Sequence, residues 1–205
     1  MRKLLLTTAA VAAAIAGAVA GETAFGTFTD ERDGKIYRTV KMPDGKTWMA
    51  YNLNYKTGNS WCFLNDVSNC KRYGRLYDWN TAKKACPEGW RLPSQGDWNN
   101  LNNAIGKSGG GKKLKARIHW DRYKDGRNGH GTDNYGFSAL HSGIRYSDGA
   151  FCCADDDSEN ANWWTSTKDG DSNAYFWHVV DFDADLNDGS YDKKYGLSVR
   201  CVQNK

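Results

Sequence analysis

The strongest constraint on the fold of this chain is a stretch in which one helical pattern ends and a second begins a few residues later. Residues 79–85 suit a short helix, and Asp78 or Asn80 is placed to cap its free N–H groups. Pro87 cannot continue a helix, because its ring removes a backbone donor, and Gly89 lets the chain turn. We therefore expect the first helix to end at a rigid corner.

A second helix is expected directly after this corner. Ser94 suits a helix N-terminus, and Asp97 three positions later completes a capping-box pattern. The residues that mark the buried face of this helix recur at helical spacing: Trp98, Leu101 and Ile105. The residues that make the corner itself extended and buried are Trp90, Leu92 and Pro93. Two helices joined by this corner form the predicted framework.

Five blocks of sequence match one known family in the family's own order. They are 44–55 (DGKTWMAYNLNY), 73–80 (YGRLYDWN), 85–93 (ACPEGWRLP), 135–140 (YGFSAL) and 195–202 (YGLSVRCV). In these blocks the chain resembles the Fibrobacter succinogenes major paralogous domain, a bacterial extracytoplasmic family of C-type-lectin-like appearance. The resemblance implies an α+β, C-type-lectin-like fold, with two helices packed on short antiparallel sheets and long loops. It implies no particular activity, because the family has no established common one.

The first residues have the pattern of a secretory signal peptide. Arg2 and Lys3 precede an apolar run at 4–20, which ends in a small-residue cleavage pattern before Gly21. A transmembrane anchor is the alternative, but the run is short and alanine-rich for a span, which needs about 20 strongly apolar residues. We expect export to the periplasm, cell surface or medium, and this division of the chain: a signal peptide at 1–20, a polar lead-in at 21–32 and a single domain at 33–205.

Charge and composition exclude one class of partner. The chain has 28 Lys and Arg against 24 Asp and Glu, a balance that does not indicate nucleic-acid binding. No membrane span is expected once the signal peptide is cleaved. The 9 Trp, 11 Tyr and 7 Phe can build a core from few residues, or line a ligand site.

Six cysteines in an exported chain predict disulfides. Cys62 and Cys70 bracket a short loop and are expected to pair. The resemblance to C-type-lectin-like domains implies a long bridge between Cys86 and Cys201. The adjacent Cys152 and Cys153 then form a strained vicinal ring, remain free thiols or bond to another molecule, and the ring is preferred because exposed thiols oxidise outside the cytoplasm.

Alternating patterns and turn signals predict the remaining elements. Asp148-Gly149 indicates a hairpin turn, and the first and last strands are expected to pair and close the domain. The glycine-rich segment 106–113 is read as a flexible connector, since the alternative, a phosphate-binding loop, lacks a Walker pattern. The predicted strands are 35–42, 47–50, 142–146, 150–153, 162–166, 174–181 and 197–202.

One acidic run is a candidate calcium site. Asp181, Asp183 and Asp185 alternate as the oxygen ligands of a calcium loop do. Leu186 occupies the sixth position, where such a loop has glycine, so a solvated acidic strand and loop is the alternative. No other cofactor is indicated.

Aromatic and amide residues near this run are candidate ligand contacts. Aromatic rings stack on the faces of sugars, and neighbouring amides and carboxylates bind hydroxyl groups, although core packing is the alternative for each ring. We expect the binding face to lie on loops at 148–195. The candidate residues are Trp164, Trp177, Tyr191, Asn187 and Asp188.

These patterns predict a secreted or cell-surface binding module without catalysis, which recognises carbohydrate or another envelope or extracellular ligand. The four histidines lack metal spacing, and no G-x-S-x-G nucleophile motif occurs. One alternative is a structural or adhesive surface protein that binds a polysaccharide or a cell-envelope protein. Another is an enzyme related to formylglycine-generating folds. The sequence does not indicate an oligomeric state.

Overall fold

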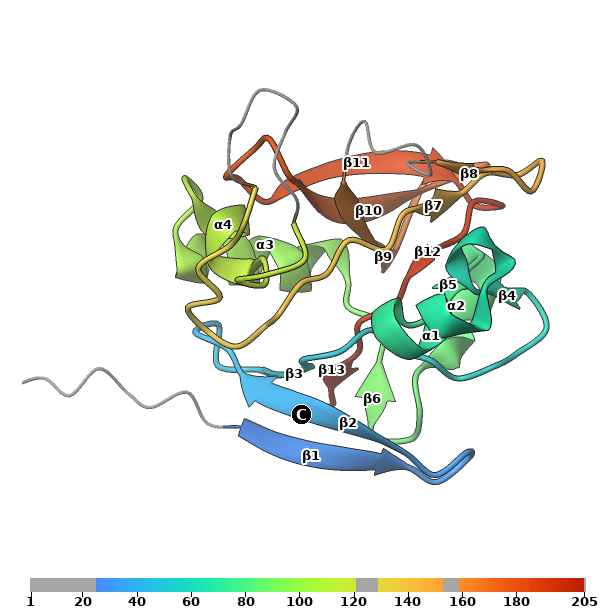
Figure 1. Cartoon of the computed structure of the whole chain (residues 1–205), viewed down its shortest axis with the longest axis horizontal. Helices are drawn as coiled ribbons and strands as arrows, with labels where there is room; N and C mark the ends of the chain where they lie inside the picture. Colours follow the sequence, from blue (N-terminus) through green and yellow to red (C-terminus); the bar gives the residue numbers. More distant parts are fainter. Residues whose placement is uncertain (1–24, 121–128, 153–158, 205) are drawn as a thin grey trace, which may run out of the picture.

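The computed structural model describes residues 25–120, 129–152 and 159–204. They form a mixed α+β fold with sheets at opposite ends of the molecule and helices between them (Figure 1). The predicted signal peptide lies outside the described residues. Within those residues, no helix has the length and apolar character needed to cross a membrane.

The first sheet is antiparallel and contains both ends of the described chain. The last strand, β13, joins it through β3, with Val202 opposite Trp48, and so does not pair with the first strand as predicted. Within the segment expected as a polar lead-in, β1 pairs along its whole length with β2. The strands in spatial order are β1 (Phe25–Asp30), β2 (Lys35–Lys41), β3 (Thr47–Met49), β13 (Val202–Gln203) and β6 (Trp90–Arg91).

The second sheet extends from the top of the view in Figure 1 down its right-hand side, where its last two strands lie beside α1 and α2. Its β11 was not predicted, and the single strand expected at 197–202 is divided between the two sheets as β12 and β13. The predicted hairpin at Asp148-Gly149 is present as a separate two-stranded sheet, formed by β7 (Ile144–Arg145) and β8 (Phe151–Cys152). The strands in spatial order are β11 (Asn187–Asp192), β10 (Asn173–Val180), β9 (Asn160–Asp169), β12 (Leu197–Ser198), β5 (Leu76–Tyr77) and β4 (Ser60–Trp61).

Both predicted helices are present. Helix α2 (Trp79–Ala85) is capped by the Asp78 carboxylate, which accepts the N–H of Thr81. Helix α3 (Gln95–Ile105) begins with the complete capping box of Ser94 and Asp97. Three short helical elements were not predicted, and the last of them replaces the second half of the expected glycine-rich connector: η1 (Phe63–Asn65), α1 (Val67–Tyr73) and α4 (Gly110–Leu114).

Two disulfides between described residues fix this arrangement, the first expected from the short loop between its cysteines and the second implied by the family resemblance. The Cys62–Cys70 bridge closes the loop that contains η1 and the first turn of α1. The Cys86–Cys201 bridge joins the end of α2 to the residue before β13, across 115 positions. Cys153 lies outside the described residues, so its pairing with Cys152 stays a prediction.

The core has two parts, one on each face of β9. Trp163 points to the side of α3, where its ring stacks on Trp98 with ring centroids 5.4 Å apart. Trp164 points to the opposite side, toward α2 and β5. Successive strand residues point to opposite faces, as predicted, and here both faces are covered.

Candidate functional site

Two of the predicted ligand contacts are wrong. Trp164 is 0% exposed and donates its indole N–H to the carbonyl oxygen of Tyr77 at 2.8 Å. Trp177 is 2% exposed and donates to the side-chain oxygen of Gln95, also at 2.8 Å. Neither ring offers a face to a ligand, because each is enclosed by the helices and strands that cover β9 and β10.

The other three predicted contacts lie on strand β11 and not on a loop. The ring of Tyr191 stacks on Phe176 with centroids 4.2 Å apart, and its burial raises the pKa of the phenol. Asn187 donates to the carboxylate of Asp183, and Asp188 accepts from Gln95. Because β9, β10 and β11 fill much of 148–195, the expected loop surface is largely a sheet. A ligand-binding role for Tyr191, Asn187 and Asp188 stays a prediction.

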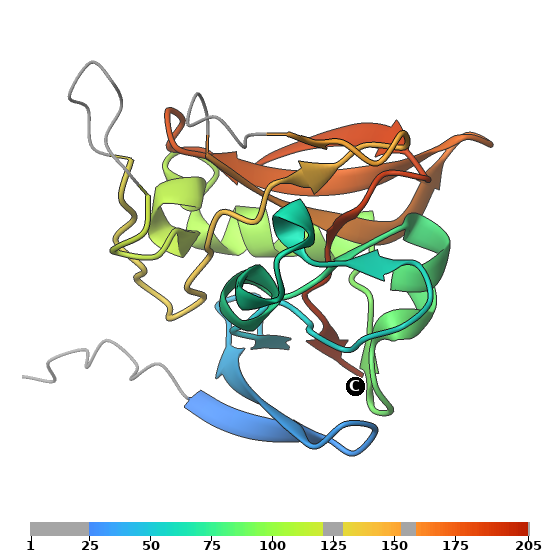
Figure 2. The same cartoon turned by 45° about the vertical axis from the view of Figure 1, so that its right-hand side comes forward.

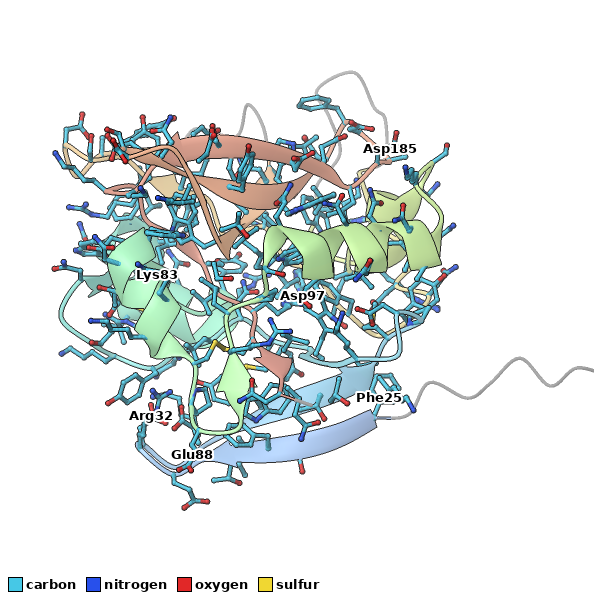
Figure 3. The ribbon with its side chains drawn as sticks, turned by 180° about the vertical axis from the view of Figure 1, so that it is seen from behind. Phe25, Arg32, Lys83, Glu88, Asp97 and Asp185 are labelled. Atoms are coloured by element: carbon cyan, nitrogen blue, oxygen red, sulfur yellow. A yellow bond between two sulfur atoms is a disulfide. The ribbon has the colours of Figure 1, made fainter. Side chains whose placement is uncertain are left out.

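A lysine side chain of the protein contacts the backbone of the acidic run 181–185. The Lys115 ammonium donates to the carbonyl oxygens of Val180 at 2.8 Å and of Asp181 and Asp183 at 3.1 Å each. Lys115 is buried, and burial lowers the pKa of its ammonium to about 8. Asp185 is committed elsewhere, since it accepts the backbone N–H of Gly109 beside α4 (Figure 3).

These contacts leave the calcium hypothesis without support. In the described part of the chain, no group of three or more His, Cys, Asp or Glu side chains is arranged to hold a metal ion. The carboxylates of Asp183 and Asp185 serve instead to shape the turn, because they accept backbone N–H groups within it and from the α4 segment.

A cleft of about 470 Å³ lies elsewhere, between β2, α1 and the segment 138–140. In Figure 2, α1 is seen above the β1–β2 hairpin, with the chain that leads to β7 beside it. The sequence did not reveal this cleft, because five segments far apart in the chain meet there. Its lining residues are Lys35, Ile36, Tyr37, Tyr51, Asn52, Asn54, Cys70, Lys71, Arg72, Tyr73, Gly74, Ser138, Leu140 and Arg200.

Tyrosines and amides form much of the cleft wall. Tyr51 is 41% exposed, so a large part of its ring is open to solvent. The hydroxyl of the buried Tyr37 accepts the backbone N–H of Asn54 at 3.0 Å, and burial raises the pKa of this phenol to about 12. Tyr73 packs against the imidazole of His141, with ring centroids 4.9 Å apart. The wall therefore combines an open ring with fixed polar groups.

Arg200 enters the cleft from the core. It is 1% exposed, and its guanidinium lies 4.1 Å from the ring centre of Phe137, whose carbonyl oxygen accepts from Nη1. Its Nε donates to the side-chain oxygen of Asn52 at 3.1 Å. Burial lowers the pKa of the guanidinium to about 9. Among the described residues, no carboxylate forms an ion pair with it.

The family model of the Fibrobacter succinogenes major domain matches residues 34–203. This chain belongs to that family. Searches of curated proteins and of solved structures gave no match. The family match begins one residue before β2 and ends in β13, so β1 lies outside it while every lining residue of the cleft lies inside.

In this member of the Fibrobacter succinogenes major domain family, the cleft has a positive lining. Four basic residues line it, Lys35, Lys71, Arg72 and Arg200, and no acidic residue among those described does. The ammonium of Lys35 pairs with the carboxylate of Asp33, which is two residues earlier in the chain. The cleft can therefore hold a ligand that accepts hydrogen bonds and carries negative charge.

Proposed function

We propose that this protein is an extracytoplasmic module that binds a carbohydrate in the cleft, without catalysis and without a cofactor. The observation that carries the proposal is the combination, in one cleft, of the exposed Tyr51 with the amide side chain of Asn54. A ring can pack on the apolar face of a sugar, while amides bind its hydroxyl groups. The cleft volume of about 470 Å³ is in the range of small-ligand sites.

Binding is favoured over catalysis by the chemistry of the lining. In the described part of the chain, the lining has hydrogen-bond donors and aromatic rings but no carboxylate or imidazole. General acid–base chemistry most often uses those groups. An enzyme related to formylglycine-generating folds has no such supporting observation.

Location outside the cytoplasm is supported by the two disulfides, since such bridges persist in oxidising compartments. We also propose that the fold is C-type-lectin-like at the finer level. The Cys86–Cys201 bridge between α2 and the end of the chain, which the family resemblance implied, supports this assignment.

A glycan array probed with the mature protein tests the proposed function. We expect binding to at least one class of polysaccharide, with Tyr51→Ala lowering affinity about tenfold, equivalent to about 1.4 kcal/mol. The matched control is Tyr191→Ala, which removes a ring from β11 and should leave affinity unchanged. A loss confined to Tyr191→Ala would move the site to the β11 face. The absence of any glycan binding would favour the structural or adhesive alternative.

A further inference from the structure

We infer that the ligand of the cleft is an acidic sugar, whose carboxylate pairs with the guanidinium of Arg200. This inference rests on the proposed function and names the chemical class that the cleft selects. It assigns Arg200 as the anion receptor, Asn52 as the residue that orients it, and Lys71 and Arg72 as basic residues around the entering ligand.

Among the described residues, no carboxylate pairs with the charge of Arg200. Placing a charged group inside a protein costs several kcal/mol unless an opposite charge compensates it. Other arginines of this chain have that compensation: Arg32 pairs with Asp30, and Arg91 pairs with Asp97. Arg200 is the most buried of these three, yet no described carboxylate pairs with it. A bound carboxylate would supply the missing charge.

The hydrogen bonds of Arg200 lead to the same conclusion. A guanidinium has five N–H groups. One N–H goes to Asn52 and one to Phe137, and no described acceptor takes those of Nη2. No side-chain atom of Arg200 is among the described polar atoms that are both buried and without a hydrogen-bond partner, so Nη2 is not sealed from solvent. Arg200 lines the cleft. The open N–H groups are therefore available to a ligand in the cleft.

Neighbouring groups hold the guanidinium in place for this role. Asn52 accepts from Nε of Arg200, and its amide nitrogen donates to the backbone oxygen of Tyr73 at 2.9 Å. The nearby Asp133 cannot easily swing toward Arg200, because both its oxygens accept from Ser138, at 2.8 and 2.7 Å. A fixed planar fork matches a carboxylate better than a flexible ammonium does.

Two kinds of acidic polysaccharide carry groups that a guanidinium binds, namely uronic acids and sulfated sugars. The uronic acid is favoured, because a planar carboxylate accepts two parallel N–H bonds from one guanidinium edge. In a uronic acid the carboxylate is also attached directly to the sugar ring, which the tyrosine wall can contact. The experiment therefore compares both classes.

Calorimetric titration of the wild-type protein tests the inference with three probes: an oligogalacturonide, its methyl ester and a sulfated oligosaccharide of similar length. Methyl esterification removes the charge and keeps the sugar. We expect the acid to bind at least tenfold more tightly than the ester, with an affinity that falls as salt rises. Equal binding of acid and ester would overturn the inference but leave the proposed function standing. Preference for the sulfated probe over the acid would overturn the carboxylate assignment.

Two variants identify the receptor. Asn52→Asp places a carboxylate next to Arg200, so the acid should lose its advantage and the ratio of acid to ester affinity should approach one. Lys71→Gln keeps the core intact and should lower affinity for the acid a few fold, without changing that for the ester. Lys107→Gln removes a lysine outside the cleft and should change neither. An unchanged ratio in a folded Asn52→Asp protein would exclude Arg200 as the receptor. If that variant does not fold, an unchanged acid affinity in Lys71→Gln contradicts the inference.

Discussion

The Nε of Arg200 and the side-chain oxygen of Asn52 lie 3.1 Å apart, and their hydrogen bond joins residues 148 positions apart in the chain. The same oxygen accepts the indole N–H of Trp163 at 2.9 Å. The amide nitrogen of Asn52 donates to the backbone oxygen of Tyr73. One buried amide therefore connects the cleft to the centre of the core, so the shape of the cleft depends on residues that no ligand touches.

Removal of this amide should weaken the whole fold. Asn52→Ala leaves the buried donors of Trp163 and Arg200 without their acceptor, and each such loss costs about 1 to 3 kcal/mol. We expect the free energy of unfolding to fall by about 2 to 4 kcal/mol, measured by denaturant titration. The control is Asn54→Ala, at a second amide of the cleft wall, which should cost less than about 1 kcal/mol. Similar losses in both variants would contradict the central role of Asn52.

Asp97 should make stability depend on pH. Burial alone would raise the pKa of this carboxyl, but hydrogen bonds from Arg91, Ser94 and Lys46 hold it well below the ordinary value. The folded state therefore stays ionised when the unfolded chain begins to take up protons, near pH 4. The stability that Asp97 contributes is complete above that pH and is lost as the pH falls through its folded-state pKa.

We accordingly expect Asp97→Asn to lower the free energy of unfolding by about 2 to 4 kcal/mol near pH 7. The difference from wild type should shrink below about pH 4. Denaturant unfolding across this pH range measures it. Glu88→Gln, at the exposed turn before β6 in Figure 3, is the control and should show no such trend. A constant difference from pH 3 to pH 7 would mean that the charge of Asp97 is unimportant.

Local chemistry explains what the sequence could predict. The N-termini of α2 and α3 were identified because the side chains of Asp78, Ser94 and Asp97 accept N–H groups three residues away. The hairpin at Asp148-Gly149 was identified for the same reason, since a turn requires particular residues at particular positions. In each case the residues that specify the element lie within it or directly beside it.

Long-range packing explains the features that the sequence could not predict. Strand β11 reads as an acidic loop, and it is a strand because β10 supplies its hydrogen-bonding partner. Trp164 and Trp177 cannot be distinguished from surface rings until helices are placed over both faces of β9 and β10. Arg200 lies in the block 195–202 that carries the family resemblance, but the sequence does not show that no described carboxylate pairs with it, because this appears only when distant segments meet around the cleft.

Two helical glycines should respond in opposite ways to alanine. A Cβ atom on Gly111, in α4, would lie 2.2 Å from the backbone oxygen of Asp185, which cannot move without displacing the acidic loop. A Cβ on Gly96, in α3, would meet only the Ser94 hydroxyl at an ordinary 3.6 Å. We expect Gly111→Ala to cost about 2 to 3 kcal/mol through overpacking, and Gly96→Ala to add about 0.5 to 1 kcal/mol through helix propensity. Thermal unfolding distinguishes them, and a neutral Gly111→Ala would show that α4 and the acidic loop separate readily.

Calcium should not stabilise the protein. The Lys115 ammonium already binds the carbonyl oxygens of Val180, Asp181 and Asp183, and the carboxylates of Asp183 and Asp185 accept backbone N–H groups instead of facing one ion. A ligand that binds only the folded state raises its stability, so the melting temperature reports binding directly. We expect the same melting temperature in millimolar calcium and in excess chelator. A rise in calcium would restore the acidic run as a metal site. Lys115→Met, which leaves three carbonyls unsatisfied, should lower the melting temperature in both solutions.

The two described disulfides should differ in their contribution to stability. In the chain-entropy description, the stabilisation grows with the number of residues that a bridge encloses. Cys86–Cys201 spans 115 positions and should contribute on the order of 4 to 5 kcal/mol, whereas Cys62–Cys70 spans 8 and should contribute about 2 to 3 kcal/mol. Paired alanine substitutions, one bridge at a time, measure this difference by denaturant unfolding.

Peptide mapping without reduction tests the bridges themselves and the remaining pair. We expect one peptide linked through Cys86 and Cys201, another through Cys62 and Cys70, and no titratable thiol in the denatured protein. If Cys152 and Cys153 pair with each other, digestion should release both in one peptide that is two mass units lighter than its reduced form. The protein should then run as a monomer. Two free thiols, or a dimer that dissociates on reduction, would show that the adjacent cysteines act between molecules. A peptide that links Cys86 to Cys152 would instead contradict the framework in which α2 is tied to the last strand.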